Sequence, residues 1–140
     1  MSRLWSPFIH NVQAAVRFEV RLVEKDPAPG LKAANLEGGG TVYLHGEVVV
    51  TNSDIEQAKA IPRPERSDFI VSITFTPAGA GKMRAATERN IGKRMAILID
   101  GVIACAPVVN SVLNEAAVIE GHLTKQEAER IVAGITIPAR

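Results

Sequence analysis

The chain has 140 residues, of which 46% are hydrophobic and 22% are charged, with a formal net charge of +1. This length provides the core of one domain and is short for two, and the composition is ordinary for a globular domain. The small net charge and the 4% aromatic content argue against nucleic acid or an anionic membrane as a partner. Cys105 is the only cysteine, so an internal disulfide is excluded.

The N-terminal segment has no clear helical or strand period. We expect residues 1–15 to form a tail or a short docking segment, and residues 16–137 to form one domain. No apolar run is long enough to span a membrane, and Pro7, His10 and Asn11 interrupt the apolar stretch that a signal peptide needs. The sequence therefore predicts either a cytoplasmic protein or a protein whose native leader is absent here.

The first elements are a strand and a long loop. Alternating apolar residues predict a strand over residues 17–24, with Phe18, Val20 and Leu22 on one face. Residues 25–40 contain two prolines and four glycines, which is typical of a long loop.

The next two segments are predicted as a strand and a short helix. Residues 41–50 are rich in β-branched residues, and Gly46 is expected at a bulge or a turn. Residues 51–61, TNSDIEQAKAI, are predicted to form a short helix, because Ser53 and Glu56 have the spacing of a capping box.

A strand followed by a helix is predicted in the centre of the chain. Residues 69–76 alternate between apolar and polar side chains, and residues 77–91 have helical periodicity. The expected buried face of this helix consists of Ala80, Met83, Thr87 and Ile91. Gly92 is expected to end the helix in a left-handed conformation. Gly79 and Gly81 either allow close packing or leave the start of the helix loose.

The remaining elements are a hairpin, a strand and a helix. Asp100-Gly101 between two apolar runs predicts a tight hairpin turn, because both turn positions need positive φ. A strand is expected over residues 116–123, and a final helix begins after Thr124, which forms a capping box with Glu127. The buried stripe and stop of this helix are expected at Ala128, Ile131, Val132, Gly134 and Ile135. The elements together predict an α+β, two-layer fold, with a mixed, mostly antiparallel sheet and helices on one face.

The stretch FTPAGAGKMR, residues 75–84, has the strand, glycine-rich turn and helix of a nucleotide phosphate loop. Such a loop needs a glycine and, after four residues, Gly-Lys followed by Ser or Thr. Thr76 replaces the first glycine and Met83 replaces the hydroxyl residue. Thr76 is instead a good helix cap, with Pro77 at the first helical position. We therefore predict that no nucleotide binds here and that Met83 is buried against the sheet.

Residues of catalytic or metal-binding types have structural explanations. The histidines, His10, His45 and His122, lack a metal-ligand spacing. Cys105 lies in an apolar strand and is expected to be an inert core thiol, and Asp100 is favoured by the hairpin turn. The glutamates without paired acid–base spacing are Glu115, Glu120, Glu127 and Glu129. We predict no catalytic, cofactor-binding or metal-binding residue.

A local basic run includes Lys82, Arg84, Arg89, Lys93 and Arg94. On a helix, these side chains fall mostly on the solvent side, so a solvated face is the simpler interpretation. A binding patch for an acidic partner or for anionic head groups is the alternative. The sequence leaves both interpretations open.

The second half of the chain carries a series of spaced motifs: a strand leading into a glycine-containing helix, then T..NIGK, AILIDG, AP, a short strand ending in glycine, and T..EAERI. The residues that carry them are Thr87, Asn90, Ile91, Gly92, Lys93, Asp100, Gly101, Ala106, Pro107, Gly121, Thr124, Glu127 and Ala128. In order and spacing this region resembles the periplasmic head subdomain of SecD, from the SecDF accessory complex of bacterial protein export. With VYLHGEVVVTNSDIEQAKA included, the resemblance covers residues 41–135; the NEAA stretch at 114–117 departs from the family pattern.

The resemblance implies an extracytoplasmic head module with a ferredoxin-like arrangement and contact with translocating polypeptide. It implies no cofactor and no catalytic residue. The membrane helices that hold the proton-coupled machinery of SecD are not in this sequence, so transport activity does not carry over.

We therefore expect a non-catalytic module that binds a protein or peptide partner, and neither nucleotide nor nucleic acid. The expected contact surfaces are an exposed strand edge and a groove near the helix at 77–91. The alternative is a regulatory module that senses a small ligand, and the least favoured hypothesis is a small hydrolase that uses Cys105 or a His/Asp pair. The sequence indicates neither the oligomeric state nor the identity of the partner.

Overall fold

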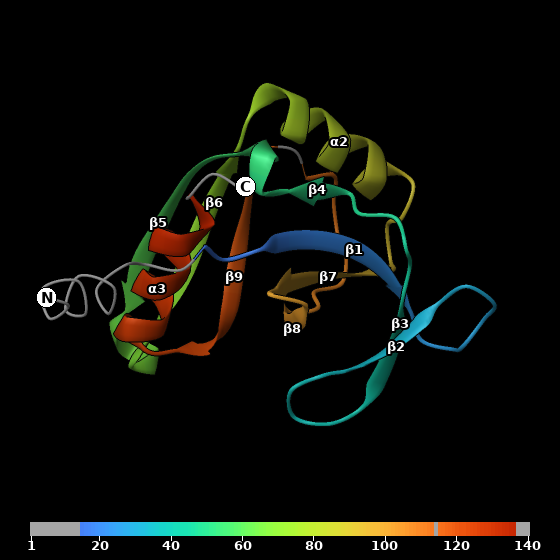
Figure 1. Cartoon of the computed structure of the whole chain (residues 1–140), viewed down its shortest axis with the longest axis horizontal. Coiled ribbons are helices and arrows are strands. Elements are labelled where there is room, and N and C mark those ends of the chain that lie inside the picture. The colour runs from blue at the N-terminus through green and yellow to red at the C-terminus, as the bar shows by residue number, and fades with distance from the viewer. Residues whose placement is uncertain (1–14, 114, 137–140) are drawn as a thin grey trace, which may run out of the picture.

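The computed structural model describes residues 15–113 and 115–136. It has an α+β architecture with antiparallel strand pairing (Figure 1), which confirms the predicted fold class. The strands divide between two sheets. Of the docking segment expected over residues 1–15, all but Ala15 lies outside the described residues. None of the helices in the described part of the chain is long and apolar enough to cross a bilayer.

The larger sheet, sheet A, has the strand order β2-β3-β1-β7-β8, with β4 also paired to β1. Its strands are β1 (Phe18–Glu24), β2 (Lys32–Asn35), β3 (Thr41–Leu44), β4 (Val50–Thr51), β7 (Arg94–Ile99) and β8 (Val102–Cys105). The β1–β7 pairing runs from Phe18 opposite Ile99 to Val23 opposite Arg94. Because the edge strands β2 and β8 also contact each other, the sheet curls around one of its faces.

The smaller sheet, sheet B, has the strand order β5-β6-β9. Its strands are β5 (Ile55–Arg63), β6 (Asp68–Phe75) and β9 (Ala116–Leu123), and short 3-10 turns, η1 (Asn52–Asp54) and η2 (Pro64–Arg66), precede β5 and β6. Helix α3 (Lys125–Ile135) packs on all three strands, whereas α2 (Pro77–Glu88) packs on β4, β6 and η1. Figure 1 shows α3 beside β5 and α2 along the top of the view, above β4.

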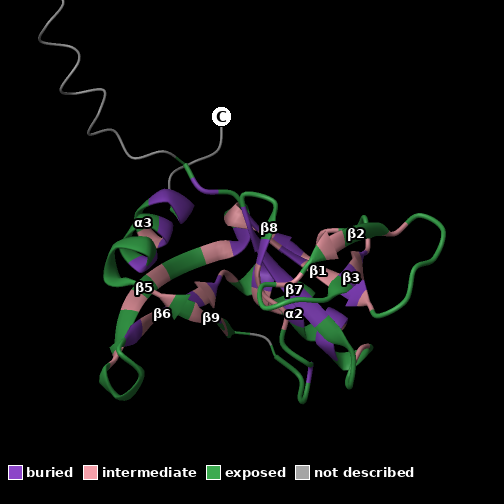
Figure 2. Cartoon of the chain, turned by 90° about the horizontal axis from the view of Figure 1, so that it is seen from below, coloured by how far each residue is buried: buried purple, intermediate pink, exposed green. Residues whose placement is uncertain are grey.

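The main core lies where both sheets and both helices meet, and Figure 2 shows buried residues on the elements around it. Its largest fully buried side chains include Phe18 of sheet A, Ile73 and Ile119 of sheet B, and Ile135 of α3. A smaller apolar cluster lies on the opposite face of sheet A, as the alternation along β1 and β7 requires. Its buried members are Val23, Val42, Leu44, Ala96, Leu98 and Ile103.

The predicted helix over residues 51–61 is wrong, because most of this segment forms β5. Ala58 and Ala60 lie opposite Ile73 and Val71 of the apolar central strand. Pairing with that strand outweighs the helix propensity of Glu, Gln, Ala and Lys.

The cap before β5 is also not the predicted one. The side chain of Asp54 accepts a hydrogen bond from the backbone N–H of Thr51 at 3.0 Å. This contact closes the 3-10 turn η1, so the capping residue is Thr51 rather than Ser53.

Four smaller predictions need correction. Part of the expected loop over residues 25–40 forms β2, which gains its partner only when β3 folds beside it. Helix α2 ends at Glu88, so Ile91 lies beyond it and is exposed. Gly92 does have a φ of 90°, but in the following turn. Gly134 is buried within α3, whose C-cap is Thr136.

The strand expected over residues 41–50 is interrupted, because β3 ends at Leu44, Gly46 lies at a bend and β4 begins only at Val50. The following predicted elements are confirmed. The strand over 69–76, the hairpin at Asp100-Gly101, the strand over 116–123 and the capping box of Thr124 with Glu127 are all present. Asp100 and Gly101 have φ values of 52° and 82°, as the tight turn requires.

Candidate functional site

The segment that resembles a phosphate loop is a packed and capped helix start. The hydroxyl of Thr76 accepts a hydrogen bond from the backbone N–H of Gly79 at 3.1 Å, and Met83 is buried, as predicted. The lysine that would approach a phosphate, Lys82, instead donates to both carboxylate oxygens of Asp54, at 3.0 and 3.3 Å. Its charge is therefore already compensated within the protein.

The residues of catalytic type do not form a reactive arrangement. Burial raises the pKa of the Cys105 thiol, which opposes formation of the thiolate. His122 Nδ1 lies 3.5 Å from a carboxylate oxygen of Asp68, and both Cys105 and His122 line one cleft. Within residues 15–113 and 115–136, however, no hydrogen bond joins Cys105 to His122, and no group of three or more His, Cys, Asp or Glu residues is placed to hold a metal ion.

Asp68 belongs to a structural ion pair at the end of sheet B. Its two carboxylate oxygens accept from Arg63 at 2.8 and 2.9 Å, and Arg63 also reaches Glu120 at 3.2 Å. Hydrogen bonding to Arg63 holds the pKa of Asp68 below its ordinary value. Together, Arg63, Asp68 and Glu120 connect β5, β6 and β9 near one end of sheet B.

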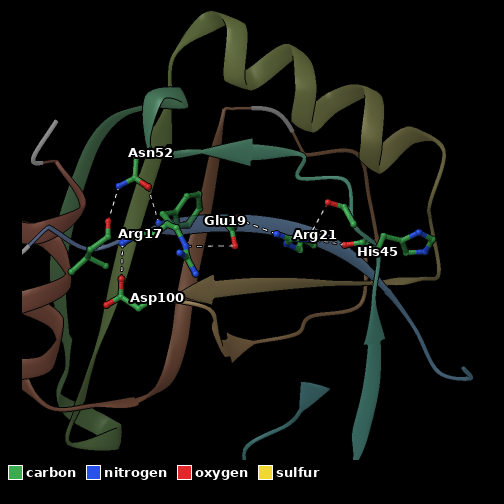
Figure 3. Close-up of polar contacts among 9 residues, drawn as sticks. Arg17, Glu19, Arg21, His45, Asn52 and Asp100 are labelled. Atoms are coloured by element: carbon green, nitrogen blue, oxygen red, sulfur yellow. Dashed lines mark hydrogen bonds and ion pairs between the residues drawn. The ribbon is translucent and has the colours of Figure 1, made fainter. Parts of the chain in front are cut away.

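Polar contacts along β1 fix its start and its half-buried polar side chains, Glu19 and Arg21 (Figure 3). Asn52 accepts from the backbone N–H of Phe18 at 2.7 Å and donates to the carbonyls of Val16 and Ile135 at 2.7 and 3.0 Å. Asp100 accepts from the backbone N–H of Arg17 at 2.8 Å. Asp100 thus has the structural role that the turn predicted.

The side chain of Arg21 is held by hydrogen bonds and an ion pair in the same row of polar contacts along β1. Its guanidinium donates to the carbonyls of His45 and Gly46, each at 3.0 Å, and lies 3.3 Å from Glu19 (Figure 3). Because these groups already satisfy one another, this row is not an open site.

The basic run between Lys82 and Arg94 is partly neutralised by acidic groups. Three of its cations contact acidic groups from different elements: Lys82 contacts Asp54, Arg84 contacts Glu88 at 3.8 Å, and Lys93 contacts Glu24 at 3.7 Å. Within the part of the chain that the structure describes, Arg89 and Arg94 make no ion pair.

The groove expected near the helix at 77–91 is present. It has a volume of about 360 Å³ between α2 and the segment before β4. Its lining consists of Leu22, Glu47, Val48, Val49, Lys82, Ala85, Ala86 and Arg89.

An exposed strand edge is also present, on β5. Among the described strands, β5 pairs only with β6, so its outer edge has no strand partner. Lys59 and Pro62 lie on this edge, and both residue types discourage the addition of another strand.

A larger pocket, which we call the sheet-end pocket, opens at the end of sheet A where β1 finishes and β7 begins. Its volume is about 540 Å³. Its lining consists of Val23, Glu24, Lys25, Leu36, Gly40, Thr41, Val42, Gly92, Lys93, Arg94 and Val108. The floor is apolar and continues into the smaller apolar cluster through Val23 and Val42. The charged residues are Glu24, Lys25, Lys93 and Arg94.

Sequence reasoning missed this pocket because its walls come from four separate segments. Residues 36–42 fall in and just after the predicted loop, and residues 92–94 follow the predicted helix. Val108 reaches the site through a bridge between its backbone and that of Arg94. The only sequence signal was the end of the basic run, at Lys93 and Arg94.

Comparison with known proteins identifies several relatives. The family model described as SecDF, P1 head subdomain, matches residues 29–136. The SecD protein translocase subunit of Elusimicrobium minutum is 36% identical over 105 residues, which cover 75% of this chain and 22% of that protein. The SecDF subunit of Thermus thermophilus is 41% identical over 91 residues, which cover 61% of this chain and 12% of that protein.

Solved structures of SecDF are also similar. One is the structure of SecDF described as a membrane component that enhances protein export. It matches with a TM-score of 0.72 and 25% identity, and the match covers 97% of this chain and 69% of that chain. Another, of SecDF in a super-membrane-facing form, has a TM-score of 0.70 and 25% identity, covering 97% of this chain and 21% of that one. The chain spans less than a quarter of the length of the SecD protein of Elusimicrobium minutum and of the SecDF protein of Thermus thermophilus.

Proposed function

The chain belongs to the SecDF P1 head subdomain family, as its sequence motifs predicted, and from this membership we propose that it binds segments of protein outside the cytoplasm. The relatives are subunits of the protein translocase, so polypeptide is the natural class of partner. We propose that the module acts by binding alone, without catalysis and without transport activity of its own.

The observation that carries this proposal is the sheet-end pocket. Its volume of about 540 Å³ lies within the range of roughly 300–1,000 Å³ that is usual for pockets holding a small molecule, so it has room for a few side chains of a polypeptide. Val23, Leu36, Val42 and Val108 give it an apolar lining, which suits the apolar side chains that an unfolded polypeptide exposes.

The relatives, which are protein translocase subunits, favour polypeptide over a small regulatory ligand. The shape of the pocket is compatible with polypeptide. Here the floor is apolar and the charges of Lys25, Lys93 and Arg94 lie around it. Gly40 and Gly92 contribute no side chain to the lining, which leaves room for an extended backbone.

A crosslinking experiment tests the proposal with a matched pair of positions. Val108 lines the pocket and is 44% exposed, whereas Val118 is 39% exposed on β9 and does not line it. We expect a photoreactive amino acid at position 108 to capture an unfolded, reduced polypeptide, and the same group at position 118 to capture little.

Neutral substitutions give the binding test. Val108→Asn removes apolar lining at a surface position, so binding of the unfolded polypeptide weakens, whereas Val118→Asn leaves it unchanged. Equal capture at both positions, or equal affinity of the two variants, would show that the pocket is not the binding site. Absence of binding to any unfolded polypeptide would contradict the proposed function itself.

A further inference from the structure

We propose that the sheet-end pocket selects segments of polypeptide in which a carboxylate lies next to an apolar side chain. This inference rests on the proposed function and names the class of segment that the site takes. The observation behind it is that some charged residues of the pocket form ion pairs within the protein, whereas Lys25 and Arg94 form none with any residue that the structure describes.

The single acidic residue of the pocket is already compensated. Glu24 accepts from His45 Nε2 at 2.8 Å and lies 3.7 Å from Lys93 Nζ. The hydrogen bond to His45, assisted by Lys93, holds the pKa of Glu24 below its ordinary value, so the carboxylate stays ionised at neutral pH. Glu24 and Lys93 therefore largely cancel each other, and neither determines the charge that a ligand must carry.

Two cations of the pocket remain. Arg94 begins β7 opposite Val23, and by strand alternation its side chain lies on the same face as Ala96 and Leu98 of the smaller apolar cluster. Lys25 directly follows β1 and also lines the pocket. Neither side chain makes an ion pair with any other residue that the structure describes. The uncompensated charge of the pocket is therefore positive.

An apolar floor beside two available cations sets the chemistry of the ligand. An apolar side chain of the ligand is stabilised by the apolar lining, and a neighbouring carboxylate can pair with the guanidinium of Arg94, which can form two parallel hydrogen bonds. A lysine at the same place would meet Arg94 and Lys25 as a like charge, which disfavours basic segments. The pocket thus selects acidic segments by attraction and disfavours basic segments by repulsion.

Three labelled peptides of equal length test the inference directly. All alternate leucine with one polar residue, which is glutamate, glutamine or lysine, and their affinities are measured by fluorescence anisotropy at low and high salt. Because a partly exposed ion pair contributes up to about 1 kcal/mol, we expect the glutamate peptide to bind about fivefold more tightly than the glutamine peptide. The advantage decreases as salt screens the pair, and the lysine peptide binds most weakly.

Variants assign the effect to the two cations. Arg94→Gln and Lys25→Gln each reduce the advantage of the glutamate peptide. Arg84→Gln is the matched control, because Arg84 belongs to the same basic run but pairs with Glu88 on α2 and does not line the pocket. Lys25 lies in a loop between β1 and β2, so Lys25→Gln keeps the test decisive if Arg94→Gln perturbs the start of β7.

The outcomes separate the inference from the proposed function. A glutamate advantage that Lys25→Gln and Arg94→Gln remove, and that Arg84→Gln preserves, supports the inference. Equal binding of all three peptides, or tighter binding of the lysine peptide, overturns the inference and leaves polypeptide binding intact. Failure of every peptide to bind, together with failure of an unfolded protein to bind, overturns both.

Discussion

Gly79 and Gly81 lie two positions apart in helix α2, but their surroundings are opposite. A Cβ atom added to Gly79 would lie 2.7 Å from the Cβ of Asp54 and 2.8 Å from its carbonyl oxygen, whereas one added to Gly81 would meet nothing within 4 Å. Gly79 thus allows the close approach of α2 to η1, and Gly81 has no such steric role.

The two positions predict effects of opposite sign. Gly79→Ala forces α2 away from Asp54, and we expect it to lower the free energy of unfolding by about 2 kcal/mol, as overpacking does. Gly81→Ala replaces a poor helix former at a position where the added methyl group meets no neighbour, and we expect the free energy of unfolding to rise by up to about 1 kcal/mol. Urea unfolding of the two variants measures both values, and effects of the same sign would contradict this account of the helix start.

The pair of Asp68 with Arg63 makes stability depend on acidic pH. The folded-state pKa of Asp68 is lowered, so between this value and the unfolded-state pKa of about 3.9 the unfolded chain binds more protons. The stabilisation is complete above the unfolded-state pKa and is lost as pH falls through the folded-state pKa.

We therefore expect Asp68→Asn to be less stable than the wild type at neutral pH, with a difference that shrinks in acid. Chemical unfolding across the acidic range measures this difference. Asp26→Asn is the control, because Asp26 is exposed in the loop after β1 and makes no ion pair within the described residues. A difference that stays constant with pH would show that the Asp68 charge is not what stabilises this end of sheet B.

At the scale of elements, β5 combines the composition of a helix with the contacts of an edge strand. Its exposed residues include Glu56, Gln57 and Lys59, which favour helix, while its inward Ala58 and Ala60 pack beside β6. Strand structure here depends on a neighbour rather than on local preference.

The conflict between the helix propensity and the strand structure of β5 predicts the sign of a change in stability. Lys59→Thr replaces a helix former with a β-branched residue at an exposed position opposite Ser72, and we expect the free energy of unfolding to rise by about 0.5 kcal/mol. If the segment were helical, the same change would destabilise the protein. Arg130→Thr, on the exposed side of α3, is the matched control and should be destabilising.

Elements with strong local signals were predictable, and elements defined by distant partners were not. The strand over residues 69–76 alternates cleanly, and Asp100-Gly101 demands one kind of turn, so both were correct. β2 lies within a segment rich in proline and glycine, and it becomes a strand only through β3. The sheet-end pocket was missed for the same reason, because no local pattern relates residues 23–25, 36–42, 92–94 and 108.

At the scale of the whole molecule, one core joins both sheets and both helices. We therefore expect residues 16–137 to unfold as a single cooperative unit, as their assignment to one domain predicts. Urea unfolding followed by NMR signals from β6 and from β7 should give one midpoint, which far-UV circular dichroism should share. Distinct midpoints for the two sheets would mean that sheet A and sheet B are separate folding units.

The contacts of Asn52 have a mechanical consequence. They gather Val16, Phe18 and Ile135 around one side chain, and the backbone N–H of Val16 also donates to the carbonyl of Gly134 at 3.0 Å. The path of the chain into β1 and the path out of α3 therefore meet at one place. Tension applied between these two points therefore acts directly on this small group of hydrogen bonds.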